Sequence, residues 1–524
     1  MPLAQHLRIY LMEKELIPTL KLSLDMTKVL SRMEYDGLRV NLDTLQEIKN
    51  EYQREMDKLQ VLLERSAKDA MGDTPINLAS PDDRSMLLYS CKVRDKGMWA
   101  KLFNLGTEKR GATVKQKMRK RLKKEEFKKI ILNWTDVVYK TEGECCAGCL
   151  GNGRVRPVRK DGTPSKALRI CKPCDGTGVI YRQKNIVAGF KLLPRNAGDV
   201  ASAGFKTDKV TLESRISSVT GVAKDFIKAY TRYNALRTYM STFIEGIENN
   251  VDEHGFIHPE FMQCVTATGR LSSRNPNFQN MPRGSTFAIR KVIESRFEGG
   301  SILEGDYSQL EFRVAGFLSK DKQVYDDVKK GTDVHSYTAE IIGCSRQEAK
   351  AHTFKPLYGG VSGTDAQQRY YNTFKTKYKR VSDWHDELQK EAVRTKQIKL
   401  PSGRQFAFPD ARWTAWGTAT NRTAICNYPV QGFATADLLP LALIELHRKM
   451  SEMGLESLIC NTVHDSIVLD VHPNEKEDCI RLLSDTMRDI PKLAMSRYGI
   501  DYDMPVGIEL KIGQNWLDLN PVEL

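Results

Sequence analysis

The sequence predicts an α+β chain in which helices flank an antiparallel sheet and a small metal-binding insertion interrupts the fold. Apolar runs over residues 301–303, 458–463 and 466–471 have the length of strands, and this observation predicts the sheet. Residues 333–400 read as mostly helical. Two Cys-x-x-Cys sequences about twenty residues apart predict the insertion.

Long helices are predicted before the sheet. Residues 17–35 read as a helix that ends at Asp36-Gly37, and Asn41 can cap a second helix that runs to about residue 63. Residues 222–249 form a further long helical stretch.

Two aspartates stand where the predicted strands end. Asp306 follows the first apolar run, and Asp465 lies between the other two. A buried charge there is costly unless a cation lies beside it. Two carboxylates can hold two Mg²⁺ ions about 3.5–4 Å apart, the arrangement that serves phosphoryl transfer from a nucleoside triphosphate. We predict Asp306 and Asp465 as metal ligands and catalytic residues; the alternative for each is an ordinary turn or capping role.

A segment between these aspartates combines cations with aromatic rings. Arg346, Lys350, Phe354 and Tyr358 recur every four residues, so on one helix they form a ridge. Such a ridge suits a nucleotide, because the cations neutralise a triphosphate while a ring packs against sugar or base. The alternative is an amphipathic helix that binds nothing.

Two further segments are rich in amide, hydroxyl, Gly and Pro residues, as expected of irregular backbone that touches phosphates and base edges: Thr266 to Pro282 and Asn427 to Gly432. The chain resembles the family A DNA polymerases in five segments that occur in the family's order: Thr266 to Pro282, the sequence around Asp306, the ridge, Asn427 to Gly432 and the turn at Asp465. The resemblance covers about four-fifths of the chain. It implies a right-hand fold of palm, fingers and thumb with an antiparallel palm sheet.

The resemblance also implies a DNA polymerase acting on primer-template DNA and deoxynucleoside triphosphates. It makes Asp306, Asp465 and the Tyr307 carbonyl the ligands of two catalytic Mg²⁺ ions. Glu311 becomes a steric gate whose carboxylate fills the space of a ribose 2′-hydroxyl. Its other nucleotide-binding residues are Arg346, Lys350, Phe354, His335, Tyr358 and Gln309. The resemblance assigns contacts with the primer, the template or the minor groove to Arg270, Gln279, Asn280, Arg290, Gln431 and His464. In the minor groove the hydrogen-bond acceptors occupy nearly the same places for every correct base pair, which suits an enzyme that accepts all four pairs.

Two departures from the family pattern bear on this transfer. Ser466 stands where the family usually has a glutamate after Asp465, so we expect catalysis on two aspartates with an altered metal preference. Pro356 follows Lys355 inside the predicted ridge, and a proline within a helix costs roughly 3 kcal/mol. We therefore predict a kink near His352.

The resemblance divides the chain into thumb (1–96 and 205–262), an insertion in the thumb (97–204), palm (263–332 and 431–524) and fingers (333–430). The proofreading domain of the family lies upstream of the thumb, so we expect a polymerase without its own 3′–5′ exonuclease. Three explanations fit this layout: the natural protein lacks proofreading, a separate chain supplies the exonuclease, or the sequence is a truncated form of a longer protein. The layout is similar to that of phage members, so we expect a bacteriophage source.

The two Cys-x-x-Cys sequences predict one structural Zn²⁺ site. Cys146, Cys149, Cys171 and Cys174 can place four thiolates around one ion, and the glycines that follow let backbone amides turn towards sulfur. The pattern resembles the zinc knuckles of J-domain chaperones, from which only metal binding is carried over. Disulfides are the alternative, and Cys145 is a substitute ligand.

A basic segment precedes these cysteines. Residues 109–129 hold eleven Lys and Arg against two Glu, and Val114, Met118 and Leu122 recur at helical spacing. We predict that this insertion is a basic flap over duplex product, or a site for a processivity factor as in some phage relatives. The alternative is a solvated basic helix without a ligand.

Composition agrees with a nucleic-acid enzyme. The 524 residues carry a net charge of +14, and no apolar run is long enough for a membrane span, so a cytoplasmic protein is expected, in the host cytoplasm if it is viral. Two rival functions are a two-metal nuclease and a single-subunit RNA polymerase. A nuclease has no use for Glu311 as a sugar gate. An RNA polymerase must incorporate ribonucleotides, and Glu311 should suppress that incorporation. A non-catalytic nucleic-acid-binding scaffold remains as a third alternative, supported by Ser466.

Overall fold

The computed structural model describes residues 9–13, 15–110, 113–116, 122–158, 162–284, 286–360, 363 and 365–523. The chain forms two compact units: residues 1–49 with 241–524, and residues 50–240. Among the helices in the described ranges, none combines the length and the apolar character needed to cross a membrane.

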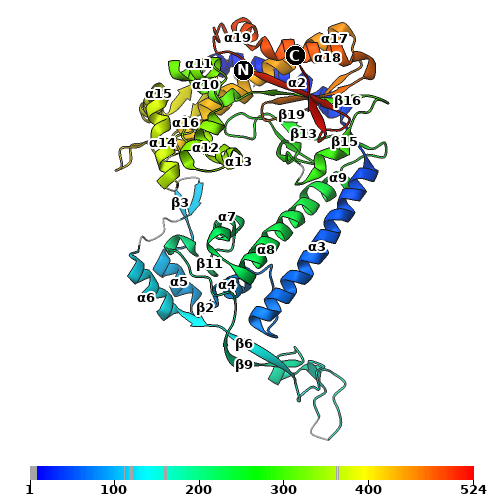
Figure 1. Cartoon of the computed structure of the whole chain (residues 1–524), viewed down its shortest axis with the longest axis vertical. Helices are drawn as coiled ribbons and strands as arrows, with labels where there is room; N and C mark the ends of the chain where they lie inside the picture. The colour runs from blue at the N-terminus through cyan, green and yellow to red at the C-terminus, as the bar shows by residue number, and fades with distance from the viewer. Residues whose placement is uncertain are drawn as a thin grey trace. The chain divides into compact units, whose positions relative to one another are not determined.

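The first unit is built on the predicted antiparallel sheet (Figure 1). Its five strands lie in the order β19 (Leu458–Val463), β20 (Ser466–Val471), β16 (Ser301–Tyr307), β21 (Ile508–Gly513) and β22 (Leu519–Pro521). Every neighbouring pair is antiparallel. The three strands expected from the apolar runs are therefore confirmed.

Helices cover this sheet. α18 contacts β16 and β21, and α2 contacts β19. A side chain at Gly305 would collide with Met487 and Leu483 of α18, so the central strand needs glycine where that helix crosses it. Helix α17 packs against both of these helices, and α19 packs against α17 and α18. The four helices are α2 (Ile17–Asp36), α17 (Leu439–Met453), α18 (Lys476–Arg488) and α19 (Ile490–Tyr498).

The segment predicted as mostly helical, 333–400, is mostly helical, with turns after Thr353 and strand β17 near its end. The helices that follow the central strand are α10 (Leu310–Ser319), α11 (Lys322–Lys329), α12 (Val334–Ile342), α13 (Arg346–Thr353), α14 (Asp365–Lys377), α15 (Lys379–Thr395) and α16 (Arg422–Gly432). Shorter elements of the unit are β1 (Leu38–Val40), α9 (Glu245–Glu248), β12 (Phe256–Ile257), β13 (Glu260–Met262), β14 (Ser272–Arg274), β15 (Ile293–Glu294), β17 (Gln397–Lys399) and β18 (Gln405–Ala407).

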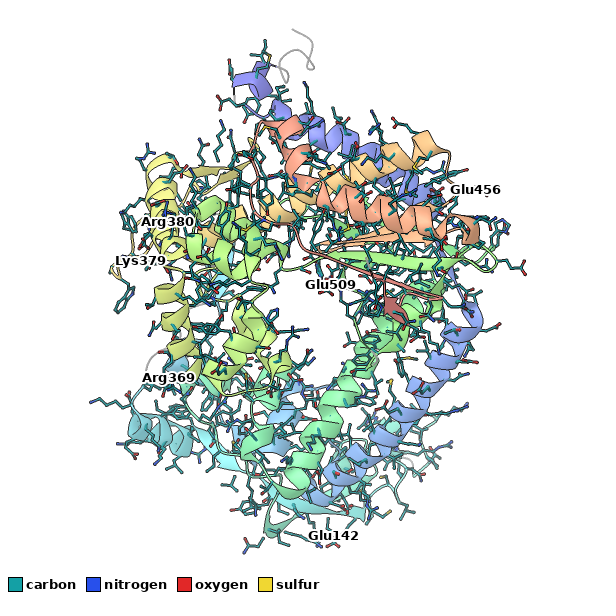
Figure 2. The ribbon with its side chains drawn as sticks, turned by 45° about the horizontal axis from the view of Figure 1, so that its top comes forward. Glu142, Arg369, Lys379, Arg380, Glu456 and Glu509 are labelled. Carbon is teal, nitrogen blue, oxygen red and sulfur yellow. The ribbon has the colours of Figure 1, made fainter. Side chains whose placement is uncertain are left out.

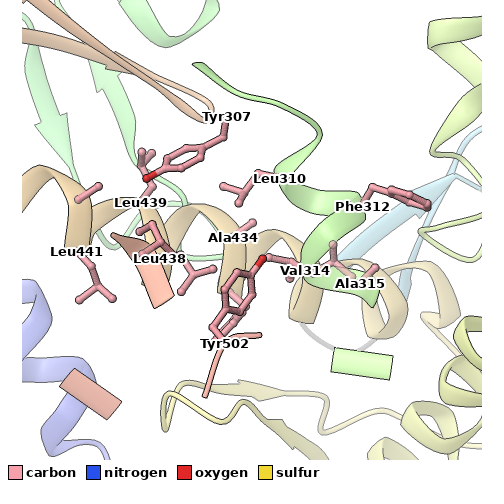
Figure 3. Packing of buried hydrophobic residues seen from close by; sticks show 14 of the residues in the cluster. Tyr307, Leu310, Phe312, Val314, Ala315, Ala434, Leu438, Leu439, Leu441 and Tyr502 are labelled. Atoms are coloured by element: carbon pink, nitrogen blue, oxygen red, sulfur yellow. The ribbon is translucent and has the colours of Figure 1, made fainter. Parts of the chain in front are cut away.

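One continuous apolar core joins strand β16 to helices α10, α16 and α17. Figure 3 shows Tyr307, Leu310 and Leu439 packed within it. The hydroxyl of Tyr307 is buried and donates to the carbonyl of Met487 at 3.0 Å. Because burial of each large apolar side chain contributes about 1.5–3 kcal/mol, this core fixes the end of β16, where Asp306 lies.

Two long helices dominate the second unit. α3 (Leu42–Met71) starts in the first unit, and Asn41 caps it as predicted by accepting from the backbone N–H of Thr44 at 2.9 Å. α8 (Gly221–Tyr239) lies beside it, since Arg232 and Glu55 form an ion pair at 2.8 Å. A π-helical turn and α9 extend α8, so the helical stretch expected over 222–249 is confirmed.

The second unit has its own core, which contains residues from the predicted insertion. Trp99 and Phe103 pack with Phe205, Phe226 and Leu63. The remaining elements of this unit are α4 (Pro81–Tyr89), β2 (Cys91–Val93), α5 (Lys96–Phe103), α6 (Lys124–Trp134), β5 (Thr135–Val137), β10 (Val200–Ala201), β11 (Gly204–Phe205) and α7 (Lys209–Glu213).

A narrower arm within this unit carries the predicted zinc cysteines. Strands β6 (Tyr139–Cys145) and β9 (Val179–Val187) pair over their length and lead to a small hairpin of β7 (Arg154–Val155) and β8 (Arg169–Ile170) (Figure 1).

The basic segment before the arm is not the helix that residue spacing predicted. Strand β3 (Thr107–Arg110) pairs with β4 (Thr113–Gln116), so Val114 lies on a strand. Met118 lies outside the described residues. Within the part of this segment that the structure describes, helix α6 begins at Lys124.

Candidate active site

Asp306 and Asp465 meet at one end of the central strands. Asp306 is on β16, where its Cα pairs with that of Ser466 on β20. Asp465 lies in the tight turn between β19 and β20, in which His464 has a φ of 58°. The backbone N–H of Tyr307 donates to the carbonyl of Asp465 at 3.3 Å. Backbone pairing therefore brings together two carboxylates that are remote in the sequence.

The electrostatics of this pair fit a bound cation. Burial raises the pKa of the Asp465 carboxyl to about 8, and the neighbouring Asp306 carboxylate adds to the rise. Oδ1 of Asp306 is buried and has no hydrogen-bond partner within the described part of the chain. Hard divalent cations prefer such oxygen ligands, so both carboxylates fit Mg²⁺.

The third carboxylate that the family places after the aspartate of the turn is absent. Ser466 is fully buried, and its hydroxyl donates to the carbonyl of Val463 at 3.0 Å. On the other side of Asp306, strand β21 places Glu509 directly opposite. Glu509 is labelled in Figure 2. Directly paired residues share a face of the sheet, so Glu509 is an acidic neighbour of Asp306 that sequence analysis missed.

Two more charged residues were missed. Arg283 donates to Oδ2 of Asp306 at 3.0 Å and lies 3.8 Å from Oε1 of Glu304. Glu304 precedes Asp306 by two positions on β16, so their side chains share one face of the strand. The alternation of side chains along a strand could have predicted from the sequence that Glu304 and Asp306 share a face. No signal in the sequence indicated that Arg283 would reach them from a loop.

The predicted sugar gate, Glu311, is held by a cation. It lies in the first turn of α10, and its carboxylate accepts from the Arg270 guanidinium. Arg270 also donates to the hydroxyl of Thr435 at 3.2 Å. Gln309 precedes this helix with a φ of 55° and directs the chain from strand to helix. The Glu311 carboxylate is thus held in position near Asp465.

Four of the predicted DNA-binding residues line one cavity of about 200 Å³: Arg270, Gln279, Asn280 and His464. The Gln279 amide donates to the carbonyl of Thr462, the residue two before His464. These polar groups converge on the side of the turn that carries Asp465.

The other two predicted DNA-binding residues lie elsewhere. Arg290 is only 3 % exposed, and its guanidinium donates to the carbonyls of Pro282 at 3.1 Å and Met281 at 3.2 Å. It therefore supports the loop before it from within the protein. Gln431 is half-buried on α16, where its carbonyl accepts from Thr435 at 2.8 Å.

Three of the predicted nucleotide-binding residues lie on α12 and α13: His335, Arg346 and Lys350. Arg346 donates to Asp333 at 2.6 Å, and this ion pair holds the pKa of Asp333 well below its usual range. The His335 ring lies 5.3 Å from that of Phe354, and its Nδ1 is 3.0 Å from the Thr353 hydroxyl. Lys350 is exposed one turn after Arg346. A phosphate-sized anion therefore has two cations within one helical face.

The single helical ridge that sequence spacing predicted is wrong in its second half. α13 ends at Thr353, so Phe354 and Tyr358 lie beyond it in a series of turns. The predicted kink near His352 is wrong for the same reason, because Pro356 follows the helix instead of interrupting it. Phe354 nevertheless stacks on Phe312 of α10, with ring centroids 6.1 Å apart.

The segment from Asn427 to Gly432 also differs from expectation. It was predicted as irregular backbone, but it forms the second half of α16 with Pro429 inside the helix. A π-helical turn, Phe433–Leu438, follows directly.

A second candidate site lies in the arm. The sulfur atoms of Cys146, Cys149, Cys171 and Cys174 all lie within 4.8 Å of one another and are buried. The sulfur atoms of Cys146 and Cys171 are 3.8 Å apart, and those of Cys149 and Cys174 are 3.6 Å apart. These distances exceed a disulfide bond of about 2.05 Å and match the edges, about 3.8 Å, of a tetrahedron with Zn–S bonds of about 2.3 Å.

Backbone amides support these sulfurs. Gly153 N–H donates to Cys149 Sγ at 3.2 Å, and Gly178 N–H donates to Cys174 Sγ at 3.3 Å. Such hydrogen bonds stabilise thiolates, so the group fits a Zn²⁺ ion. Cys145 is exposed and lies outside the group.

Comparison with known proteins places these features in a family. The chain is 30% identical over 353 residues to DNA polymerase I of Lactococcus lactis subsp. cremoris, a match that covers 63% of this chain and 38% of the relative. It is 30% identical over 339 residues to the thermostable DNA polymerase I of Thermus aquaticus, covering 60% and 39%. The chain thus spans about two-fifths of the length of these relatives.

A solved structure shares the fold. The POL domain of Pol1 from M. smegmatis, in complex with DNA primer-template and dNTP, superimposes with a TM-score of 0.61 at 20% identity, over 95% of this chain and 70% of that one. The right-hand polymerase fold expected from the sequence is therefore confirmed. The sequence profile of DNA polymerase family A matches residues 190–518, which is more than half of the chain. The chain belongs to DNA polymerase family A.

Proposed function

We propose that the chain is a DNA-directed DNA polymerase that extends a primer 3′ end with deoxynucleoside triphosphates by two-metal phosphoryl transfer. The convergence of Asp306 and Asp465 at one sheet edge, beside Glu311, carries this proposal. Both carboxylates, with the Tyr307 carbonyl, would hold two Mg²⁺ ions, and bound Mg²⁺ supplies charge neutralisation and an activated primer oxygen.

The side chains around the aspartates have separable roles in this proposal. Arg346, Lys350 and His335 bind the triphosphate, and Phe354 packs on the incoming sugar and base. Glu311, fixed by Arg270, excludes a ribose 2′-hydroxyl. The cavity lined by Gln279, Asn280 and His464 receives the primer-template minor groove, and Tyr358 stacks at the entering template base.

Primer extension tests the proposal. The wild type with Mg²⁺ and four deoxynucleotides should extend a labelled primer on a longer template. Asp306→Asn should reduce extension by at least about a thousandfold, because it removes a metal-binding charge, while changing DNA affinity in fluorescence anisotropy by less than about threefold. Extension that survives in Asp306→Asn would contradict the assignment.

Two further incubations separate the rival functions. Labelled duplex without nucleotides should remain intact, whereas a two-metal nuclease would cleave it. Ribonucleotides should be incorporated poorly, whereas an RNA polymerase would prefer them. A wild type that binds DNA but performs neither reaction would favour a non-catalytic scaffold.

We also propose that the four arm cysteines bind one structural Zn²⁺ ion and that the arm contacts duplex product. The distal part of the arm carries cations that form no ion pair within the described residues: Arg154, Arg156, Lys166, Arg169 and Lys172. Cations of this kind bind phosphates with a steep dependence on salt.

Strand pairing supplies a clean deletion of the arm. Glu144 pairs with Ile180, so a short glycine turn can join these positions and remove the four cysteines. This join keeps Thr141 and Gly143, which hydrogen-bond to Asp73 and Thr74 in the body of the unit. The shortened protein should make shorter products than wild type as salt rises. Unchanged product lengths over the salt series would refute the DNA contact, and wild-type protein without stoichiometric zinc would refute the metal site.

A further inference from the structure

The cation nearest the catalytic carboxylates is a side chain of the protein itself. Arg283 lies between Asp306 and Glu304: one terminal nitrogen donates to Asp306 Oδ2 at 3.0 Å, and the other lies 3.8 Å from Glu304 Oε1. Its side chain is 45% exposed and comes from the loop after Pro282. The guanidinium can therefore shift between its two carboxylates without disturbing a packed core.

Glu304, in contrast, is fixed. It is 9% exposed, and its Oε2 accepts from the indole N–H of Trp516 at 3.1 Å. The buried guanidinium of Arg290 lies 3.7 Å from the same oxygen and stacks over the Trp516 ring at 4.0 Å. These contacts engage Oε2 and leave Oε1 facing Arg283. Glu304 is thus a rigid acceptor, whereas Arg283 is the mobile partner.

Arg283 and a metal ion compete for the same carboxylate. A divalent cation on Asp306 repels a guanidinium 3.0 Å from Oδ2 of that residue, and each cation lowers the negative charge available to the other. When Arg283 leaves Asp306, an unpaired guanidinium beside bound metal would be costly unless an acceptor lies within reach. Glu304 is that acceptor.

We propose that Arg283 is a built-in competitor for the metal site of Asp306 and that Glu304 is a positioning residue that accepts Arg283 when metal binds. The inference rests on the proposed metal-dependent function of Asp306. Arg283 then keeps Asp306 neutralised before the metal arrives, and Glu304 lowers the free-energy cost of the exchange.

Substitutions of Arg283 and Glu304 should change the affinity for metal in opposite directions. Arg283→Ala removes the competitor, so metal should bind about fivefold more tightly, the effect expected from losing one partly exposed ion pair. Glu304→Gln keeps an amide that can accept from Trp516 but removes the alternative charge. Arg283 then stays on Asp306, and metal should bind about threefold or more weakly.

A double-mutant cycle separates exchange from simple loss of a nearby negative charge. If Glu304 acts through Arg283, Glu304→Gln should have little effect in the Arg283→Ala background, and the double variant should resemble Arg283→Ala. If Glu304 merely attracts the ion, its threefold effect should persist in both backgrounds.

Mn²⁺ titration followed by electron paramagnetic resonance measures this on the full chain without DNA or nucleotide. Arg497→Ala is the matched control, since it breaks a partly exposed Arg–carboxylate pair between α19 and α2, with Asp25 at 2.9 Å, and should leave Mn²⁺ affinity unchanged. Thermal melting confirms that each variant is folded. Should Glu304→Gln fail to fold, Arg283→Ala alone still tests the competition, because its side chain is exposed.

The outcomes are distinct. Tighter Mn²⁺ binding by Arg283→Ala with a non-additive cycle supports the inference. Unchanged binding by Arg283→Ala, or an additive cycle, overturns it while wild-type extension and Asp306-dependent Mn²⁺ binding stand. Loss of the proposed function looks different, because wild type itself would then show no Mn²⁺ binding that Asp306→Asn removes.

Discussion

Replacing Gly178 with alanine should disable the predicted zinc site. Gly178 has a φ of 77°, and a Cβ there would lie 2.2 Å from the carbonyl oxygen of Gly151. The left-handed conformation costs alanine about 1 kcal/mol. The collision also displaces Gly178 from two hydrogen bonds, to the sulfur of Cys174 at 3.3 Å and from the N–H of Cys146 at 2.9 Å, each contributing about 1 kcal/mol. The total of about 3 kcal/mol corresponds to roughly hundredfold weaker zinc binding.

Gly162→Ala is the matched control in the same arm. Gly162 has a φ of 82°, but a Cβ there meets nothing within 4 Å, so only the conformational cost of about 1 kcal/mol applies. Zinc affinity can be measured by competition with a chromophoric chelator. Gly178→Ala should lose zinc at least about tenfold more readily than Gly162→Ala. Equal affinities would refute the role assigned to the backbone contacts around the sulfurs.

Two further predictions concern the first unit. Glu311→Ala should raise the incorporation of ribonucleotides relative to deoxynucleotides by about tenfold or more, because the carboxylate no longer fills the space of the 2′-hydroxyl. The measurement is the ratio of the two kcat/KM values. An unchanged ratio would contradict the role of Glu311 as a steric gate. Burial lowers the pKa of His385 to about 4, so only the unfolded state takes up its proton between about pH 6.5 and 4. The free energy of unfolding should fall on acidification by up to about 1.4 kcal/mol per pH unit more in wild type than in His385→Gln, as measured by urea unfolding; parallel pH profiles would contradict this assignment.

The sheet and the meeting of the two aspartates could be predicted because each depends on local signals. One apolar run ends at Leu303, three residues before Asp306, and another ends at Val463, two residues before Asp465. A short turn then makes β19 and β20 pair as neighbours. Once β16 pairs with β20, the backbone alone brings the aspartates together. No side-chain geometry was needed for that inference.

The nucleotide-binding ridge could not be predicted from spacing alone. Pro356 disfavours helical backbone at Lys355 and cannot donate a helical hydrogen bond, so α13 stops at Thr353 instead of bending. At Pro429, in contrast, the helix does not stop, and α16 continues through the proline. Ile425, Cys426 and Val430 are completely buried there, and their packing outweighs the local preference.

The arginine network around Asp306 depends on tertiary contacts that no motif records. Glu304 and Asp306 share a strand face by simple alternation, but only the folded loop places Arg283 between them. The same holds for Arg290, whose position suggested a DNA contact and whose side chain is buried against Trp516. Sequence spacing identifies the acids, while the fold determines which cations reach them.

The most direct test is an anomalous-scattering measurement on crystals grown with primer-template, a non-hydrolysable deoxynucleotide and Mn²⁺. Two anomalous peaks about 3.5–4 Å apart should appear, each contacted by the carboxylates of Asp306 and Asp465. A map with no peak between these residues, or with Mn²⁺ held by other carboxylates, would contradict the proposed catalytic site.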